Sequence, residues 1–301
     1  MKLKHLKNYV CATVLVAATS TLAATRSVPS QYSTIQAAIN AAASGDTISI
    51  ANGTYSGQVN IPSTKSKLNI VGASQTGVIL TAGTDQIAMT VSGSDITFSY
   101  LTIQNTTGPT GGNTNHAVYV YGSRVEFYRC YIKGWQDTIY LGGGPDYFTL
   151  SEIRGSVDFI YGGAAAFFTS CNIMQVRSTG GPATAPNTPQ TQTYGLVFSS
   201  CYVGGESGVA AGSSTLMRPW GPYGESVYIN CTMDASISAA GWISFDGNNT
   251  ATCRAYEYGS KTPSGATINL ATRAAWVVRL SSAQAATYTK NNVLGGWTPP
   301  L

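Results

Sequence analysis

The sequence predicts an all-β protein: a single-stranded, right-handed parallel β-helix (solenoid) with a short capping helix near its N-terminus. Helical signal is concentrated in one segment, residues 33–42. Most of the later sequence consists of short β-branched and aromatic runs separated by Gly, Ser, Asn and Thr. These runs repeat a common pattern, and the repetition favours a solenoid over a sandwich or a barrel.

The N-terminus has the features of a secretory signal peptide. Residues 1–7 are basic, an apolar stretch follows from Tyr9 to Ala18, and small residues surround Ala23. The apolar stretch is too short to span a bilayer, so we expect no membrane anchor. The sequence therefore predicts a signal at 1–23, a single β-helix domain at 24–301, and a secreted, extracellular product.

Residues 33–42 predict one helix. The segment begins with Ser33 and Thr34, which are favourable cap residues, and its apolar positions recur at helical spacing until Gly45. An uncovered end of a coil stack would pair with other chains. We therefore expect this helix to cover the first coil.

Six similar units indicate the coils. Each has the form aromatic-x-x-(small or apolar)-x-apolar, and the units begin at Phe98, Phe127, Phe148, Phe168, Phe198 and Tyr228. Their fourth positions, 101, 130, 151, 171, 201 and 231, lie 20 to 30 residues apart. Solenoids tolerate such variation because insertions fall in loops outside the stacked core. Equivalent residues should form ladders with a spacing of about 4.8 Å.

The cysteines fit the same ladders. Beyond the signal there are five, Cys130, Cys171, Cys201, Cys231 and Cys253, and an odd number cannot all pair within one chain. The first four occupy equivalent repeat positions, so we expect them inside the coils as small apolar side chains. A disulfide between neighbours remains an alternative.

Charge and composition exclude several classes of function. Without the three signal lysines the formal net charge falls from +4 to +1, and no Lys/Arg cluster remains to bind nucleic acid. Glycosylation sequons occur at Asn52, Asn105, Asn230 and Asn248, which is consistent with a secreted glycoprotein. We expect a monomer.

Two aspartates share one repeat position. Asp137 lies seven residues after Cys130, and Asp158 lies seven residues after the equivalent Ser151. The two carboxylates should therefore lie at the same angular position on consecutive coils, and such a pair should hold one proton more tightly than usual. Aspartates often only cap turns. Here the shared register and the strand-like flanking runs favour a catalytic pair, with one ionised group and one proton donor.

The surrounding motifs resemble those of the pectin methylesterase (pectinesterase) family. Gln136-Asp137-Thr138 is similar to the family's Gln-Asp-Thr, and residues 158–162 (DFIYG) are similar to its Asp-Phe-Ile-Phe-Gly. Residues 216–220 (LMRPW) are similar to its Leu-Gly-Arg-Pro-Trp. The order of the motifs also matches, and the resemblance extends from Ile35 through Trp242.

The resemblance implies hydrolysis of pectin methyl esters to pectate and methanol through an acyl-enzyme. Asp158 would be the nucleophile, and Asp137 would protonate the departing methanol and then activate water. Gln136 would donate to the oxyanion, and Arg218 would hold Asp158 ionised. Neither a metal nor an organic cofactor is required, and pectin (homogalacturonan) is the expected partner.

Further residues are implied in substrate binding. Trp220 and Tyr161 would face the sugar chain, because aromatic rings suit the apolar faces of sugars. Trp135 and Trp242 are weaker candidates, since a tryptophan in a coil stack is more often core. His116 stands where the family has a second oxyanion-donating Gln, and its hydrogen bonding would depend on its protonation.

Two other departures from the family pattern, Gly57 in place of an acidic residue and Met217 in place of a glycine, should affect packing or substrate fit.

Rival interpretations stay open. A polygalacturonase would need the Asp-Asp pair that this chain lacks, and a pectate lyase would need clustered calcium-binding acids. A serine esterase would need a Gly-x-Ser-x-Gly elbow, which is also absent from the sequence. A catalytically idle pectin-binding solenoid would need no ionised buried aspartate.

Overall fold

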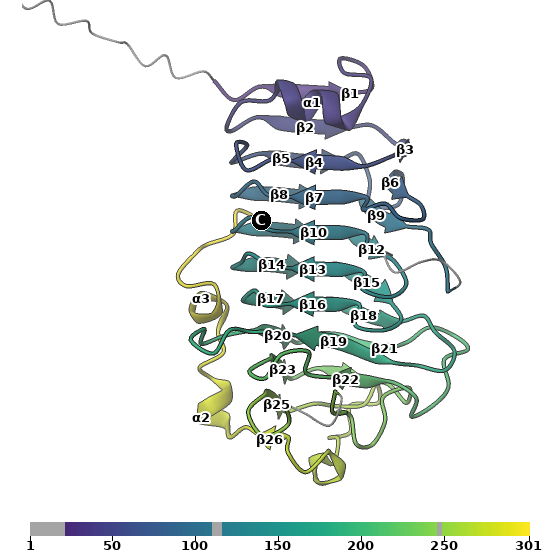
Figure 1. Cartoon of the computed structure of the whole chain (residues 1–301), viewed down its shortest axis with the longest axis vertical. Coiled ribbons are helices and arrows are strands. Elements are labelled where there is room, and N and C mark those ends of the chain that lie inside the picture. Colours follow the sequence, from purple (N-terminus) through teal and green to yellow (C-terminus); the bar gives the residue numbers. More distant parts are fainter. Residues whose placement is uncertain (1–21, 110–115, 246–248) are drawn as a thin grey trace, which may run out of the picture.

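The fold is known from a computed structural model that describes residues 22–109, 116–245 and 249–301 (Figure 1). Almost the whole predicted signal segment, 1–23, therefore lies outside the described residues. Three parallel sheets run along the length of the molecule, with 11, 8 and 7 strands, here called sheets A, B and C. From β2 to β22, successive strands along the chain enter sheets A, B and C in turn, so each of these coils contributes one strand to each sheet. The predicted right-handed parallel β-helix is confirmed.

Each sheet is a ladder of short parallel strands. Sheet A contains β1 (Thr25–Val28), β2 (Thr47–Ile50), β5 (Asn69–Gly72), β8 (Ile96–Ser99), β11 (Val125–Tyr128), β14 (Asp146–Thr149), β17 (Ala166–Thr169), β20 (Leu196–Ser199), β23 (Glu225–Ile229), β25 (Arg254–Tyr258) and β26 (Val278–Arg279). Sheet B contains β3 (Gly53–Ser56), β6 (Val78–Ala82), β9 (Thr102–Asn105), β12 (Tyr131–Lys133), β15 (Glu152–Gly155), β18 (Asn172–Gln175), β21 (Tyr202–Gly205) and β24 (Thr232–Met233). Sheet C contains β4 (Val59–Ile61), β7 (Met89–Val91), β10 (Val118–Val120), β13 (Ile139–Leu141), β16 (Ile160–Gly162), β19 (Pro182–Pro186) and β22 (Thr215–Met217).

The predicted helix is α1 (Ile35–Ala41), and it lies against β1, β2 and β4 at the N-terminal end of the stack (Figure 1). It starts at Ile35 because the side chain of Thr34 accepts a hydrogen bond from the backbone N–H of Ala37. Further short helices were not predicted: η1 (Leu270–Thr272), α2 (Ser282–Ala285) and α3 (Lys290–Val293). None of the helices in the described residues is long and apolar enough to cross a membrane.

The repeat predicted from the sequence is the register of the structure. The aromatic residues that open the six units pair across sheet A, from Phe98 with Phe127 to Phe198 with Tyr228. Their rings stack inside the solenoid at centroid distances of 4.5–4.8 Å and interplanar angles of 15° or less. Such pairs add about 0.5–1.5 kcal/mol each beyond their burial, so this column stabilises the stacking of coils.

The cysteines lie where the repeat predicts. Cys130, Cys171, Cys201 and Cys231 are buried and unpaired, and Ser151 takes the equivalent place in its own coil. The residue before each of these positions, and before the equivalent Leu101, has a left-handed φ of 50–57°, which turns the chain from sheet A into sheet B: Tyr100, Arg129, Leu150, Ser170, Ser200 and Asn230. Ladder packing rather than a disulfide therefore explains these cysteines.

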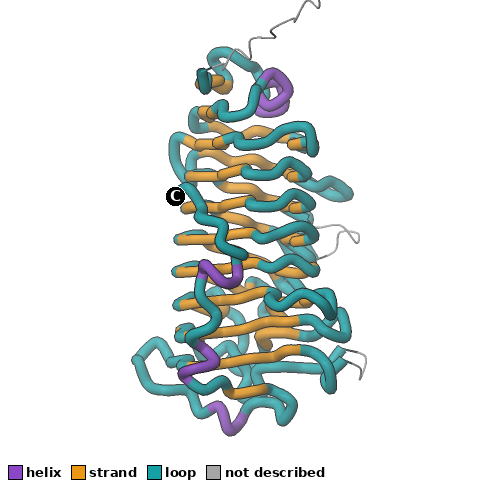
Figure 2. Tube along the Cα trace, turned by 90° about the vertical axis from the view of Figure 1, so that its left-hand side faces the viewer, coloured by secondary structure: helices purple, strands orange, loops and turns teal. Residues whose placement is uncertain are grey.

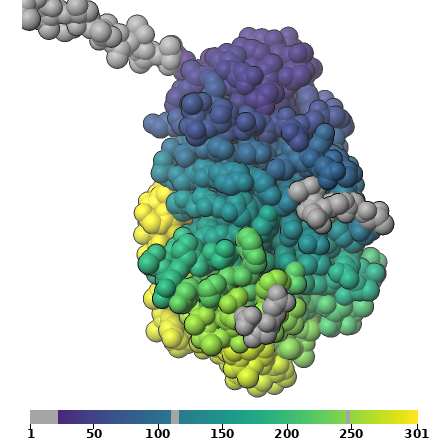
Figure 3. Space-filling view, in the orientation of Figure 1, coloured from purple at the N-terminus to yellow at the C-terminus, as the bar shows by residue number. Residues whose placement is uncertain are grey.

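The C-terminal segment, residues 280–301, runs back along the outside of sheet A (Figures 1 and 2). Figure 3 shows this segment, in yellow, packed on the flank of the stack. Its Leu280, Ala285, Val293 and Leu294 join a second apolar cluster with outward-facing residues of sheet A such as Tyr147. Sheet A is therefore covered by chain on its outer face over β11–β25, and this cover was not predicted.

Candidate active site

The two aspartates precede equivalent strands of sheet C. Ile139 pairs with Ile160 in the β13–β16 ladder, so Asp137 and Asp158, each two residues earlier, share one register. The backbone N–H of Asp137 donates to the carbonyl of Val157 on the next coil at 3.0 Å. Neighbouring coils are about 4.8 Å apart, and the two carboxylates are therefore close.

The strand-like local conformation predicted around these aspartates is wrong at the aspartates themselves. Asp137 and Asp158 have φ angles of 55° and 51°, in the left-handed region. Aspartate adopts this conformation at lower cost than most side chains because its short polar group can hydrogen-bond locally. The chain bends at both residues before it enters sheet C, and each carboxylate lies at a turn rather than within a strand.

A pocket of about 190 Å³ contains both carboxylates. The residues that line it come from five successive coils: Gln136, Asp137, Asp158, Tyr161, Ala185, Trp220 and Phe245. Larger hollows exist elsewhere on the molecule, but this pocket combines paired acids with aromatic walls. Size alone would not identify it.

Arg218 pairs directly with Asp158. Its Nε donates to Oδ1 of Asp158 at 2.8 Å and to Oδ2 at 3.0 Å, and its Nη2 also contacts Oδ2. The guanidinium carbon lies 4.7 Å from the ring centroid of Phe245, which makes a cation–π contact. Arg218 follows β22, two coils beyond β16, so its long side chain reaches back to Asp158. The carboxylate of Asp158 is therefore oriented and electrostatically stabilised.

The two carboxyl groups differ in their surroundings. Burial, and then the charge of Asp158, raise the pKa of Asp137 to about 6, against the hydrogen bond of Gln136 and the charge of Arg218. Burial also raises the pKa of Asp158, but the hydrogen bonds and charge of Arg218 oppose that rise. Because Arg218 bonds both oxygens of Asp158, the ionised form is favoured more strongly at Asp158 than at Asp137.

An aromatic row extends the pocket along the outer face of sheet C. Trp220 is 46% exposed, and its ring lies 5.7 Å from that of Tyr161 in an edge-to-face contact. Tyr161 is followed by Tyr140 at 5.0 Å, and Tyr140 by Tyr119 at 5.3 Å. The row ends at the exposed Tyr121, which contacts both Tyr119 and Tyr140. Such a row suits the apolar faces of sugar rings.

His116 does not lie where the prediction needs it. It is 3% exposed and is not among the residues that line the pocket. Its Nε2 shares hydrogen bonds with the hydroxyls of Tyr161 at 2.8 Å and Tyr119 at 3.1 Å. Burial lowers the pKa of His116 to about 4, so the ring is neutral near pH 7. A direct contact with substrate is therefore not supported, because Nε2 is already engaged with tyrosines and Nδ1 is buried.

The other candidates separate clearly. Gln136 is exposed at the pocket, beside the carboxyl of Asp137. Trp242 is 1% exposed and packs edge-to-face on Tyr228, so it belongs to the core as expected. Trp135 is half-buried and does not line the pocket, while Met217 is fully buried.

Several site residues were missed by sequence reasoning. Tyr119 and Tyr140 follow His116 and Asp137 by three residues, the same offset by which Tyr161 follows Asp158. The repeat that located the aspartates would therefore also have located the tyrosine ladder. Phe245 had no such signal, because it lies beyond β22 in a loop outside the repeat.

No group of three or more His, Cys, Asp or Glu is arranged to hold a metal ion within residues 22–109, 116–245 and 249–301. The chemistry that these residues can perform is nucleophilic attack by an ionised carboxylate, assisted by a neighbouring carboxylic acid.

Comparison with known proteins gives a consistent picture. The sequence profile of a family described as Pectinesterase matches residues 21–297. Pectinesterase A of Dickeya dadantii (strain 3937) is 30% identical to this chain in an alignment 334 residues long. The alignment covers 90% of this chain and 88% of that protein. An Arabidopsis thaliana protein described as pectinesterase/pectinesterase inhibitor 38 is 31% identical over 296 residues and 89% of this chain. The chain spans only 61% of the length of that Arabidopsis relative.

Solved structures resemble the whole fold. A pectin methylesterase crystallised in complex with a hexasaccharide has a TM-score of 0.79 and 29% sequence identity. The similarity covers 94% of this chain and all of that one. The likeness therefore includes the coils that carry the aspartates as well as the framework around them.

Proposed function

The chain belongs to the pectinesterase family, and from this premise we propose that it hydrolyses the methyl esters of pectin, releasing methanol and leaving pectate. The observation that carries the proposal is the pair of register-matched carboxyl groups, Asp137 and Asp158, in one pocket, with Arg218 bonded to both oxygens of Asp158. An ester needs a nucleophile and a proton donor for its leaving alcohol, and this asymmetric pair supplies both.

In the first step, an ionised oxygen of Asp158 attacks the carbonyl carbon of the methyl ester. The electron pair of that carbonyl moves to its oxygen, and the amide of Gln136 is suitably exposed to donate a hydrogen bond to it. The C–O bond to the methoxy group then breaks, and methanol leaves with the proton of Asp137. An anhydride between Asp158 and the substrate remains.

In the second step, Asp137 is now ionised and accepts a proton from water. The water attacks the anhydride, the bond to Asp158 breaks, and the free uronic acid leaves. Asp137 has regained its proton and Asp158 its charge, so the site is restored. Arg218 serves both steps, because it favours the ionised form of Asp158 as attacking and as leaving group.

Trp220 and Tyr161 are proposed to bind the sugar rings next to the reacting ester, since both line the pocket. His116 is proposed to act as a positioning residue for Tyr161 through their hydrogen bond. A related pectin methylesterase structure contains a bound hexasaccharide, which supports a chain of several sugars as the ligand.

Secretion is also a proposal. It rests on the basic-apolar-small order of residues 1–23. Asn52 and Asn230 are exposed and suit glycosylation, whereas Asn105 is buried and its amide donates to the carbonyls of Gln86 and His116. Glycosylation is therefore proposed at the first two sites and not at Asn105. Asn248 lies outside the described residues.

Methanol release from highly esterified pectin tests the proposal. We expect methanol without new reducing ends and without unsaturated products. New reducing ends would indicate a glycosidase, and unsaturated products would indicate a lyase. Purified protein that binds pectin but releases no methanol would instead be a polysaccharide-binding solenoid.

A further inference from the structure

Asp46 is a buried carboxylate at the N-terminal end of the stack, and it takes no part in the proposed chemistry. It lies immediately before β2 and is 2% exposed. A buried carboxylate is costly unless its charge is paired and its oxygens accept hydrogen bonds. Both oxygens of Asp46 are engaged, and one partner is the backbone nitrogen of Ala24, the residue before β1 (Figure 1). A charged group therefore lies at the point where the first strand begins.

Three donors surround this carboxylate. The backbone N–H of Ala24 donates to Oδ1 at 2.8 Å, and the backbone N–H of Ala43 donates to Oδ2 at 2.9 Å. Nε of Arg26 donates to Oδ2 at 2.7 Å. Burial opposes ionisation, but the bonds from these three donors outweigh burial and hold the pKa of Asp46 below its ordinary value. Asp46 is therefore ionised near neutral pH.

Ala24 is held by hydrogen bonds on both of its backbone groups. Its carbonyl oxygen accepts a bond from the backbone N–H of Thr47 at 2.9 Å, and its own N–H donates to Asp46. By contrast, Ala23 is exposed and Leu22 is 93% exposed. Within the described part of the chain, attachment to the first coil therefore begins at Ala24.

This boundary coincides with the end of the predicted signal segment, 1–23. Signal cleavage follows a small residue, and both Ala23 and Ala24 satisfy that requirement. Hydrolysis of the peptide bond between them adds one water and leaves a carboxylate on Ala23 and an ammonium group on Ala24. That ammonium nitrogen is the atom that lies 2.8 Å from Oδ1 of Asp46. Cleavage one residue later would instead remove Ala24 and leave Oδ1 without this donor.

We propose that a signal peptidase cleaves the chain between Ala23 and Ala24, and that the new α-ammonium group forms an ion pair with Asp46. The inference rests on the proposed secretion and is independent of the esterase activity. A charged donor bonds a carboxylate about twice as strongly as a neutral one. Two cations can share this carboxylate because they bond different oxygens, and Arg26 also donates to the hydroxyl of Tyr32. The first coil is therefore more stable after cleavage than before it.

The test begins with the full chain, expressed in a secreting host, and with the mass of the secreted product. We expect the product to begin at Ala24. Its α-amino group is then acetylated at about pH 6.5, where it reacts ahead of lysine side chains because it is the weaker base. Acetylation restores the amide N–H of the uncleaved chain and removes only the charge. We expect the thermal unfolding midpoint to fall by about 1–3 °C.

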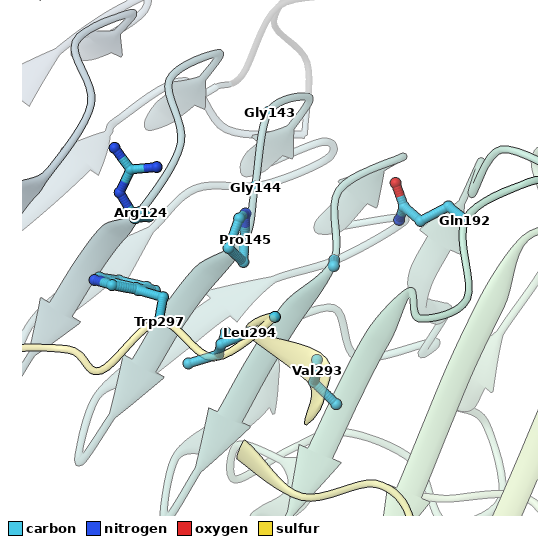
Figure 4. A pocket seen from close by; sticks show the side chains of 10 residues that line it. Arg124, Gly143, Gly144, Pro145, Gln192, Val293, Leu294 and Trp297 are labelled. Carbon is cyan, nitrogen blue, oxygen red and sulfur yellow. The ribbon is translucent and has the colours of Figure 1, made fainter. Parts of the chain in front are cut away.

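Asp46→Asn separates the ion pair from other effects of acetylation, which should leave the midpoint of this variant unchanged. Asp95→Asn is the matched control, because Nε and Nη2 of Arg124 donate to Asp95 at 2.6 and 2.8 Å. Figure 4 shows Arg124 at a hollow that Trp297 also lines. Asp95 precedes β8, two strands beyond β2 in sheet A, so acetylation should lower the midpoint of Asp95→Asn as it does in the wild type.

A second measurement needs no variant. The ion pair raises the pKa of the α-amino group, so its stabilisation is complete below about pH 8, the ordinary pKa, and is lost as the pH rises further. The difference in midpoint between the free and the acetylated wild type should therefore shrink from about pH 8 to pH 10. Arg26 and Tyr32 face the same carboxylate, but they are common to both forms and cancel in the difference.

The inference is overturned if the secreted product begins at any residue other than Ala24. It is also overturned if acetylation shifts the midpoint equally in the wild type and in Asp46→Asn, or shifts neither. A product that still carries residues 1–23 would contradict the proposed secretion as well. Methanol release by the same product bears on the esterase activity alone.

Discussion

Sheets A and C both bury carboxyl groups, but in different settings. On sheet A, Glu126 and Glu225 have no exposed surface, and burial raises the pKa of each to about 7. The C-terminal segment covers both: Leu301 donates to Glu126, and the hydroxyl of Tyr288 lies 3.0 Å from Glu225. On sheet C, Asp137 has a similarly raised pKa, yet it lines a pocket.

The difference teaches that a perturbed pKa alone does not identify an active site. What distinguishes sheet C is access, a second carboxyl group at the same register, and a cation bonded to that second group. On sheet A the acids accept hydrogen bonds from the C-terminal segment. On sheet C they line a pocket that a substrate can enter. Variants on the two sheets should therefore separate catalysis from stability.

The largest expected effect is on Asp158. Asp158→Asn should reduce kcat for methanol release on the order of 10⁴-fold, because the proposed nucleophile is lost. The fold should persist, since the asparagine can still accept a hydrogen bond from Arg218 and tolerates a left-handed φ. Methanol assays with circular dichroism as a folding control check this. An Asp158→Asn protein with wild-type turnover would eliminate the proposed nucleophile.

Asp137 should govern the alkaline side of the pH profile. It must carry a proton when methanol leaves, and its pKa is raised to about 6. We therefore expect kcat/KM to fall as the pH rises above about 6, while protonation of Asp158 lowers it at acidic pH. Asp137→Asn should lower kcat about 10²- to 10³-fold. Initial rates across pH check the profile, and a kcat/KM that keeps rising through this range would contradict the assignment.

The two aspartates and their shared register were predictable because a β-helix turns sequence period into spatial alignment. A step of 21 residues between Cys130 and Ser151 reappears as the step between Asp137 and Asp158. Phe245 and the C-terminal segment were not predictable. Phe245 lies outside the repeat, and α2 and α3 are only four residues long, too short to produce a helical pattern.

The bend at the aspartates was missed for a related reason. The residues around Asp137 and Asp158 are β-branched and aromatic, which favours strands. Tertiary pairing nevertheless places each aspartate at a left-handed turn just before its strand. The burial of His116 and its hydrogen bond to Tyr161 were also not predictable, because the bond joins side chains two coils apart.

Trp220→Ala should have a smaller effect, mainly on binding. Loss of an exposed ring from the pocket should raise KM about three- to tenfold with little change in kcat. Steady-state kinetics on pectin check this split. Trp242→Phe serves as a contrast, because Trp242 is in the core and should affect the thermal unfolding midpoint rather than KM. An unchanged KM in Trp220→Ala would show that this residue does not contribute to substrate binding in the pocket.

His116→Ala should lower kcat/KM about two- to fivefold, in keeping with loss of a single hydrogen bond to Tyr161. Since the pKa of His116 is lowered to about 4, the ring stays neutral above about pH 5 and the shape of the profile there should not change. If the change in kcat/KM near pH 6 to 7 were lost or shifted in His116→Ala, His116 itself would titrate during catalysis. His116→Gln is the conservative variant and should recover part of the loss.

The smallest effect on activity is expected from Glu126→Gln, which should leave kcat/KM unchanged. Its effect is on stability. The folded protein keeps a proton on Glu126 up to about pH 7, whereas the unfolded chain releases it near its ordinary pKa of 4.5. The stabilisation is therefore complete below about pH 4.5 and is lost as the pH rises through 7. In Glu126→Gln, the thermal unfolding midpoint should therefore vary less with pH over this range than in the wild type. A changed rate of methanol release would contradict the contrast between the sheets.

The proximity of the two aspartates can be tested without any substrate. In the wild-type chain the charge of Asp158 helps to raise the pKa of Asp137, and Arg218 is bonded to Asp158. NMR titration of the Asp137 carboxyl carbon in the Asp158→Asn variant should give a lower pKa than in the wild type, because the neighbouring negative charge is gone. An identical pKa in the two proteins would mean that the carboxyl groups do not interact, and the account of the site would fail.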